Sequence, residues 1–301
     1  MKPTAILTAD WHLRDTQPIC RTDDFWESQW IKAYYISAIQ KRYKCPIIHA
    51  GDLFHTWKTS PYLLSASIAF FSQLELGDKE GPAFLTVYGN HDLPQHSMEL
   101  AQRSGMHTLH TAQNITILSN GHWGEAAPNG SISELLAGDA FENVAVWHKY
   151  TYTGNKPWPS CTEPTAEQIL RKFSKYKLIV TGDNHTPFVV KYKGRLLVNP
   201  GSITRQTADQ AEHLPRVYLW FAETNTVTEE FLPIKVDVIT KEHLEIKAER
   251  DTRMEAFISR LKEDWNVSLS FEDNLKEFLS SNKLRKSVIA LIHKAMDGEM
   301  L

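Results

Sequence analysis

Five short apolar segments of this chain each run directly into aspartate, asparagine or histidine. The segments are ILTADWH, IIHAGDLFH, LTVYGNHD, VAVWHKY and LIVTGDNH, and in chain order they present Asp10 and His12, Asp52, Asn90 and His91, His148, and Asp183 and His185. Short runs rich in Val, Ile and aromatic residues predict buried strands. Because the carboxyl ends of strands gather at one edge of a sheet, we expect these polar side chains to converge there.

Glycine stands immediately before three of these polar residues, at Gly51, Gly89 and Gly182. Glycine tolerates backbone angles that other residues avoid, so it permits a sharp turn where a strand ends. Each motif taken alone is compatible with a polar turn, a helix cap or a hydrogen-bonded core histidine. Their repetition in order at five strand ends favours one shared site over coincidence.

The ligand types predict divalent metal ions. Carboxylate, amide and imidazole groups without a thiolate suit Mn²⁺, Fe or Zn²⁺ better than Ca²⁺. A set of this size exceeds what one such ion needs and fits two ions that share a bridging carboxylate, with positions left for water and substrate. Two ions about 3.5–4 Å apart stabilise an in-line phosphoryl displacement, so the pattern predicts a metal-dependent phosphoesterase.

The rest of the pattern predicts an α/β fold in which a mixed sheet is layered with helices. Apolar residues at helical spacing predict helices over 24–42 and 61–75. After Pro233 the pattern changes to amphipathic helices, so we expect a main domain over 1–233 and a helical region over 234–301. That region either packs on the main domain or docks a partner protein. The predicted strands are 4–9, 46–50, 84–88, 115–118, 144–148, 177–181, 188–192, 195–199, 216–221 and 227–233.

The composition limits the compartment and the partners. The net charge of −3 lacks the basic excess of a typical sequence-independent DNA-binding protein. Three cysteines, Cys20, Cys45 and Cys161, form neither a disulfide framework nor a CxxC clip, which favours a reducing compartment. No apolar stretch approaches the length of a membrane span, and the first apolar run is too short for a signal peptide. We therefore expect a cytoplasmic protein, located in the host cytoplasm if a phage encodes it.

The ordered set D-x-H, G-D, G-N-H-D, a lone His and G-x-x-H resembles the calcineurin-like metallophosphoesterase superfamily. The fuller segments HAGDLFH and LVNPGSITR are similar to those of SbcD-type DNA-repair nucleases of bacteria and phages. The resemblance covers roughly residues 4–233 and implies a four-layer α/β/β/α sandwich with a small C-terminal helical appendage. It also implies a DNA substrate, an SbcC-like ABC-type ATPase partner and, as is frequent in the family, a homodimer.

The resemblance assigns a role to each motif residue. His91 would assist the departing oxygen or stabilise the transition state. His55 would contact a substrate phosphate or make a structural hydrogen bond. The first metal ion would be held by Asp10, His12 and His185, the second by Asn90, His148 and Asp183, and Asp52 would bridge the two.

Two features depart from the family. The family usually has G-H-x-H where this chain has Gly182-Asp183-Asn184-His185. A carboxylate at position 183 still binds hard ions, and its charge favours Mn²⁺ or Mg²⁺ over softer ions. The region after Pro233 is also short for the family, as expected of a reduced DNA cap or of helices that serve only the partner.

The sequence thus predicts a two-metal nuclease of exo- or endonuclease type within an SbcCD-like DNA repair and recombination complex. Mn²⁺ is the first expectation, with Mg²⁺, Fe or Zn²⁺ as alternatives. Two other functions stay open. One is a phosphatase or small-molecule phosphodiesterase of the same superfamily, and the other is a catalytically impaired metal-binding partner protein.

Overall fold

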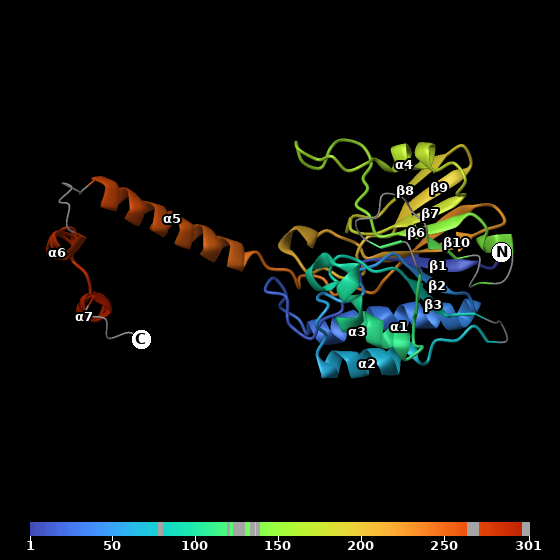
Figure 1. Cartoon of the computed structure of the whole chain (residues 1–301), viewed down its shortest axis with the longest axis horizontal. Coiled ribbons are helices and arrows are strands. Elements are labelled where there is room, and N and C mark those ends of the chain that lie inside the picture. The colour runs from blue at the N-terminus through green and yellow to red at the C-terminus, as the bar shows by residue number, and fades with distance from the viewer. Residues whose placement is uncertain are drawn as a thin grey trace. The chain divides into compact units, whose positions relative to one another are not determined.

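The computed structural model describes residues 1–77, 81–118, 121–122, 130–132, 136, 139–263 and 271–296. Backbone contacts divide the chain into two units, Met1–Thr240 and Lys241–Leu301. The first unit contains both sheets and every residue of the candidate site (Figure 1).

The first sheet has six strands in the order β11-β10-β1-β2-β3-β4. Strands β1 to β4 run parallel, whereas β10 pairs antiparallel with β1, and β11 pairs antiparallel with β10. The strands are β1 (Ala5–Thr8), β2 (Ile47–His49), β3 (Phe84–Thr86), β4 (Thr116–Ile117), β10 (Arg216–Phe221) and β11 (Thr226–Phe231).

The second sheet has five strands in the order β5-β6-β7-β9-β8. Its central strands β6, β7 and β9 are parallel, and β5 and β8 add antiparallel edges. The strands are β5 (Gly130–Ser131), β6 (Val144–Trp147), β7 (Leu178–Thr181), β8 (Phe188–Tyr192) and β9 (Arg195–Asn199).

Helices lie outside both sheets. Helices α1 (Phe25–Tyr43), α2 (Pro61–Phe71) and α3 (Gly105–Thr111) lie on the side of the first sheet, and α4 (Ala166–Lys172) contacts β8 and β9 of the second (Figure 1). This arrangement confirms the predicted mixed α/β fold. The described 3-10 helices are η1 (Pro94–His96), η2 (Met98–Arg103), η3 (Asp139–Phe141) and η4 (Ala208–Gln210).

Three apolar clusters separate the layers. The cluster between the first sheet and its helices includes Trp11 and Phe70. The cluster between the two sheets includes Leu7 and Val180, and the smallest, beneath α4, includes Trp147. The alternation of side chains along β1 and β6 sends neighbouring residues into different clusters, which fixes the register of the strands that carry the site.

Local signals explain where the helices begin. Asp24 caps α1 by accepting a hydrogen bond from the main-chain N–H of Glu27, and Ser60 caps α2 just before Pro61. Helix α2 ends at Phe71, earlier than the predicted 61–75. The short helices α3 and α4 were missed, because their seven-residue lengths give little periodic signal.

The segment that follows β11 belongs to the first unit as far as Thr240. Val238 is buried, the Thr22 N–H donates to its carbonyl at 3.1 Å, and the Thr240 N–H donates to the Cys20 carbonyl at 2.8 Å. The second unit contains α5 (Glu242–Glu263), α6 (Phe271–Ser281) and α7 (Lys286–Met296). The predicted division into a main domain over 1–233 and a helical region over 234–301 stays a prediction. Residues 264–270 and 297–301 of that helical region lie outside the described residues. No helix in the described ranges is long and apolar enough to cross a membrane.

Candidate metal centre

The polar residues that follow β1, β2, β3, β6 and β7 meet at one place. Parallel pairing aligns the carboxyl ends of β1, β2 and β3 in the first sheet and those of β6 and β7 in the second, and the packing of the two sheets brings these two edges together. Three groups of side chains there could each hold a metal ion, because the ligand atoms within each group lie within 4.8 Å of one another. The groups are Asp10 with His12 and His185, Asp10 with Asp52 and His148, and His12 with His55 and His91.

Several of these residues have an unusual backbone conformation. Asp10, His12, Asp52 and Asp183 have φ values of 50°, 46°, 58° and 75°. Non-glycine residues rarely adopt positive φ, and such residues cluster at functional sites. Hydrogen bonds hold two of them in place, from the Asp10 N–H to the Gly51 carbonyl and from the His12 N–H to the Asp52 carbonyl, both at 3.0 Å.

The glycines serve two different purposes. Gly51 has a φ of +91°, as the turn explanation requires. A Cβ on Gly89 would instead lie 2.0 Å from Asp52 Oδ1, and one on Gly182 would lie 2.3 Å from the Ala50 carbonyl oxygen. Gly89 and Gly182 are therefore required by close packing rather than by positive φ.

The first half of the centre joins two imidazoles and a buried carboxylate. Nε2 of His12 lies 3.0 Å from Nε2 of His185 and 3.5 Å from Oδ2 of Asp52. Burial lowers the pKa of His12 well below its usual value. Loss of hydration also lowers the pKa of His185 to about 4, although part of that residue faces the pocket. Both rings are therefore neutral near pH 7 and have lone pairs to offer.

Asp10 completes that half. Its Oδ1 accepts the Asp183 N–H at 3.1 Å, whereas its buried Oδ2 has no hydrogen-bond partner among the described residues. Burial raises the pKa of Asp10, because a charged carboxylate there loses its hydration. An unpartnered carboxylate oxygen beside two neutral imidazoles fits a divalent cation.

The second half gathers hydrogen-bond acceptors around His148. Its Nδ1 lies 2.6 Å from the Ala50 carbonyl, which only accepts, so Nδ1 carries a hydrogen and Nε2 is the nitrogen that faces the centre. That Nε2 lies 3.1 Å from Asn90 Oδ1, 3.5 Å from Asp52 Oδ2 and 4.0 Å from Asp183 Oδ1. A cation among these atoms would relieve the repulsion between acceptors.

Asp52 stands between the two halves. Its Oδ2 is 3.5 Å from Nε2 of both His12 and His148, and its Oδ1 accepts the His91 N–H at 2.9 Å. Burial raises the pKa of this carboxyl as well. The position is the one that a carboxylate shared by two ions needs.

Asp92 closes the GNHD motif, but the sequence motifs assign it no role. It is fully buried, and its oxygens accept the N–H groups of Leu53, Phe54 and Gly89 at 3.2, 3.0 and 3.0 Å. This carboxylate ties the loop after β2 to the loop after β3 and so holds Asp52 beside Asn90. An acid directly after a histidine-containing turn was the available signal.

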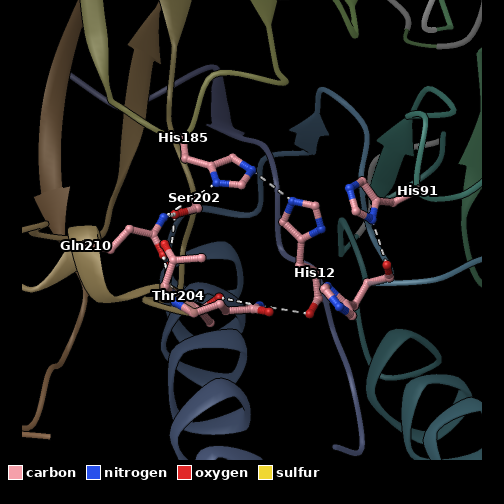
Figure 2. A pocket seen from close by; sticks show the side chains of 9 residues that line it. His12, His91, His185, Ser202, Thr204 and Gln210 are labelled. Atoms are coloured by element: carbon pink, nitrogen blue, oxygen red, sulfur yellow. Dashed lines mark hydrogen bonds between the residues drawn. The ribbon is translucent and has the colours of Figure 1, made fainter. Parts of the chain in front are cut away.

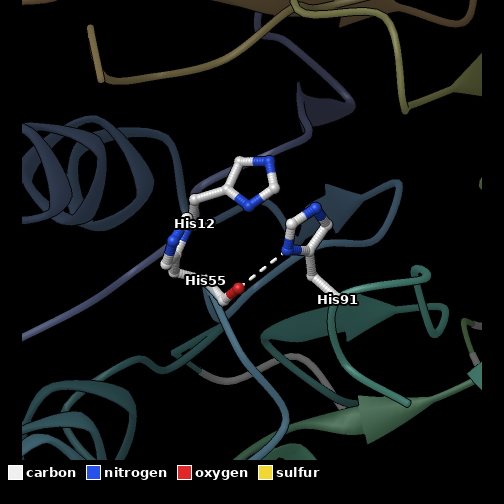
Figure 3. Close-up of side chains that lie close together, drawn as sticks. All are labelled: His12, His55 and His91. Carbon is white, nitrogen blue, oxygen red and sulfur yellow. Dashed lines mark hydrogen bonds between the residues drawn. The ribbon is translucent and has the colours of Figure 1, made fainter. Parts of the chain in front are cut away.

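His91 and His55 lie next to His12. The Nδ1 of His91 is 2.7 Å from the His55 carbonyl, which leaves Nε2 turned away from that contact (Figure 3). The ring centroids of His12 and His91 are 4.8 Å apart. Burial, followed by the positive charge of Arg14, lowers the pKa of His55 to about 4, so its ring is neutral near pH 7.

A pocket of about 200 Å³ opens beside these histidines. One wall consists of imidazoles and the other of hydroxyl and amide groups from the segment after β9 (Figure 2). Gln210 Nε2 is 3.2 Å from Ser202 Oγ and 3.5 Å from His185 Nδ1. Gln206, Thr207 and Gln210 were missed, because no local pattern distinguishes them from surface residues. The lining residues are His12, His55, His91, His185, Ser202, Thr204, Gln206, Thr207 and Gln210.

Comparison with known proteins places the chain in a family and gives relatives in sequence and in structure. Residues 6–219 match the model of a calcineurin-like phosphoesterase superfamily domain. The DNA double-strand break repair protein Mre11 of Haloferax volcanii is 25% identical over 200 residues, which are 64% of this chain and 41% of that protein. A solved structure described as a novel archaeal phosphodiesterase aligns with 76% of this chain and 99% of its own, at 13% identity and a TM-score of 0.41. The chain thus spans about two fifths of the length of the Mre11 protein.

Proposed function

This chain belongs to the calcineurin-like phosphoesterase superfamily and is a metal-dependent phosphoesterase, and from that premise we propose that it is a two-metal DNA nuclease. The observation that carries the proposal is the convergence of acceptor atoms on both sides of Asp52. The paired Nε2 atoms of His12 and His185 lie on one side, and His148 with Asn90 lies on the other.

We assign the ligands as the sequence predicts. One ion would be held by Asp10, His12 and His185, the other by Asn90, His148 and Asp183, with Asp52 between them. This ligand set contains more carboxylates than a zinc site usually has, and Asp183 is a hard, charged ligand among them. Mn²⁺ is therefore the ion that we propose first, with Mg²⁺ as the next candidate.

The chain's own groups position the substrate and supply the proton. When bound, two such ions would activate water as a nucleophile and offset negative charge on the phosphoryl oxygens. As an imidazolium, His91 would donate its Nε2 proton to the departing sugar oxygen while Nδ1 stays on the His55 carbonyl. The main-chain N–H of His91 donates a hydrogen bond to Asp52, and this contact would hold the His91 ring at a fixed place beside the centre.

Two observations support a DNA substrate. The similar Haloferax volcanii protein is named for DNA double-strand break repair. The segments HAGDLFH and LVNPGSITR extend the likeness to SbcD-type nucleases beyond the metal ligands, and Ser202 and Thr204 of the second segment line the pocket.

We also propose that the second unit docks an SbcC-like ABC-type ATPase. Described residues of this unit leave large apolar side chains exposed, including Ile246 at 59%, Phe271 at 67% and Leu291 at 62%. Exposed apolar residues of this size on amphipathic helices are typical of a surface that another protein covers. A partner that grips DNA would also compensate for the missing basic excess of this chain.

The test is Mn²⁺-dependent cleavage of end-labelled DNA by the purified chain, alone and with an SbcC-like ATPase. Asp10→Ala serves as the variant that lacks one of the proposed metal-binding side chains, and a reaction with EDTA serves as the metal-free control. We expect cleavage by the wild type only, and only with metal. Turnover of p-nitrophenyl phosphate without any cleavage of DNA would instead support a phosphatase. Metal binding without hydrolysis of either substrate would support an impaired partner protein.

A further inference from the structure

Arg14 follows His12 by two residues, and its main chain is held rigidly. Its N–H donates to Oε1 of Gln29 at 3.0 Å, and its carbonyl accepts from Nε2 of the same side chain at 2.6 Å. Gln29 lies on α1 and is fully buried. Because this clamp uses only main-chain atoms of Arg14, it holds the position of the residue relative to the metal centre whatever its side chain.

The guanidinium of Arg14 is half-buried but has neutral partners. Its Nε donates to Thr16 Oγ1 at 2.9 Å, and Nη1 donates to Gln206 Oε1 at 3.3 Å. Burial lowers its pKa, and the adjacent Asp15 acts in the opposite direction. Within the described ranges no carboxylate lies within 4 Å of this guanidinium, in contrast to those of Arg21, Arg216 and Arg253.

Gln206 fixes the direction in which that guanidinium points. Its Nε2 donates to the His12 carbonyl at 3.0 Å and to Thr204 Oγ1 at 2.9 Å, so its Oε1 is the atom that faces Arg14. Gln206 also lines the pocket beside the histidines. Arg14 is not itself a lining residue, but its positive charge lies beside Gln206 and acts on His55, and both of these line the pocket.

The pocket wall suits an anion. Its lining residues include no carboxylate, and the three acids of the proposed ligand set are not among them. Two of the five N–H groups of Arg14 are used by Thr16 and Gln206, and the others remain for a ligand with paired oxygens. A partly desolvated cation with only neutral partners is costly unless an anion joins it.

We propose that Arg14 binds a phosphate of the nucleic-acid strand that neighbours the phosphate being cleaved. The inference rests on the proposed nuclease function, because only a substrate with more than one phosphate can use this contact. Arg14 would then discriminate a polynucleotide from a small diester and would act on binding rather than on the chemical step.

The experiment compares two substrates with Arg14→Gln and Arg14→Lys. One is a single-stranded oligodeoxynucleotide, and the other is bis(p-nitrophenyl) phosphate, a diester with a single phosphate. We expect Arg14→Gln to lower kcat/KM on the oligonucleotide about tenfold or more, mainly through KM, because a charge-assisted phosphate contact is lost. Turnover of the small diester should stay within about twofold, and Arg14→Lys should recover part of the loss, since it keeps the charge.

Two further measurements make the result decisive. Arg171→Gln, on the exposed surface of α4, is the matched control and should leave kcat/KM on both substrates unchanged. Binding of a fluorescent oligonucleotide to His91→Ala, with and without Arg14→Gln, reports the contact without turnover. The slope of log affinity against log salt should fall by roughly 0.7–1 when one phosphate contact is lost.

The outcomes separate the two proposals. Equal losses on both substrates, or undiminished binding and cleavage of the oligonucleotide by Arg14→Gln, would overturn the role of Arg14 alone. A wild-type chain that hydrolyses the small diester but neither binds nor cuts the oligonucleotide would overturn the nuclease function, and the role of Arg14 with it.

Discussion

The main-chain N–H of His91 donates to Oδ1 of Asp52 at 2.9 Å, although the two residues lie 39 positions apart and follow different strands. The contact joins the candidate proton donor directly to the candidate bridging carboxylate. Gly89 permits it, because a Cβ there would overlap Asp52 Oδ1 at 2.0 Å. The close contact between the loop after β3 and the loop after β2 therefore sets the positions of both Asp52 and His91.

Replacing His91 should separate hydrolysis from metal binding. We expect His91→Asn to lower kcat about 10²–10⁴-fold, as is typical for the loss of a general acid, and to leave Mn²⁺ affinity unchanged. The asparagine amide can still donate to the His55 carbonyl that now holds Nδ1. Isothermal titration with Mn²⁺ and single-turnover kinetics measure the two effects, with the exposed His293→Asn as control. A loss of metal affinity would instead place an ion in the cluster of His12, His55 and His91.

Asp183 should set both the affinity and the choice of metal. Asp183→Asn keeps the shape of the side chain but removes its charge, so we expect Mn²⁺ affinity to fall about tenfold or more. Asp183→His restores the usual family residue and should shift preference toward Zn²⁺. Histidine tolerates the φ of 75° at this position better than most residues. Titration with both ions tests this, and Asp251→Asn on α5 is the control. Equal Mn²⁺ affinity in the wild type and Asp183→Asn would show that Asp183 is no ligand.

Gly89→Ala should abolish metal binding through overlap with Asp52. The added methyl group must displace Asp52 or its loop, since it would also lie 2.5 Å from the Asp52 nitrogen. Gly194→Ala is the comparison, because its φ of +76° strains an alanine, whereas its Cβ would meet nothing within 4 Å. We expect Gly194→Ala to cost about 1 kcal/mol of stability and to bind metal normally. Normal Mn²⁺ binding by folded Gly89→Ala would contradict the proposed packing requirement.

The buried Lys32 should make the stability of the protein depend on pH through a group outside the proposed ligand set. It is buried on α1, where its Nζ donates to the Ser28 carbonyl and to Ser28 Oγ, both at 3.0 Å. Burial lowers the pKa of Lys32 from 10.5 to about 8, helped by nearby positive charges. The nearby charged groups are Arg21, Arg205, Lys235 and the single acid Asp23.

The direction of that dependence follows from proton binding. Between pH 8 and 10.5 the unfolded chain holds a proton on Lys32 that the folded chain has released, so stability rises with pH in this window. Below pH 8 the full cost of the buried charge applies, on the order of 3 kcal/mol. Urea denaturation should therefore show that Lys32→Met gains more stability over the wild type at pH 7 than at pH 10. Lys41→Met, exposed on the same helix, should show no such difference.

The sequence could place most residues of the candidate metal centre at strand ends, because its motifs are local. Strand burial and the polar residue that ends each strand are set by neighbours in the chain, so the residues from Asp10 to His185 could be placed at the carboxyl ends of strands, although those strands belong to two sheets rather than one. Asp92 and Gln210 were not predicted, because their roles depend on loops that meet only in the folded chain. Even the reason for Gly89 and Gly182 had to come from packing.

The sequence by itself determined which side chains end the strands and that the strands are layered with helices, since alternation, burial and turn chemistry act over a few residues. Only the tertiary structure decided how the two sheets stack. That stacking brings Nε2 of His12 to within 3.0 Å of Nε2 of His185, across 173 positions of sequence. It also brings Gln206 against Arg14, 192 positions away. Such distances depend on the packing of whole layers, which no short segment of the chain encodes.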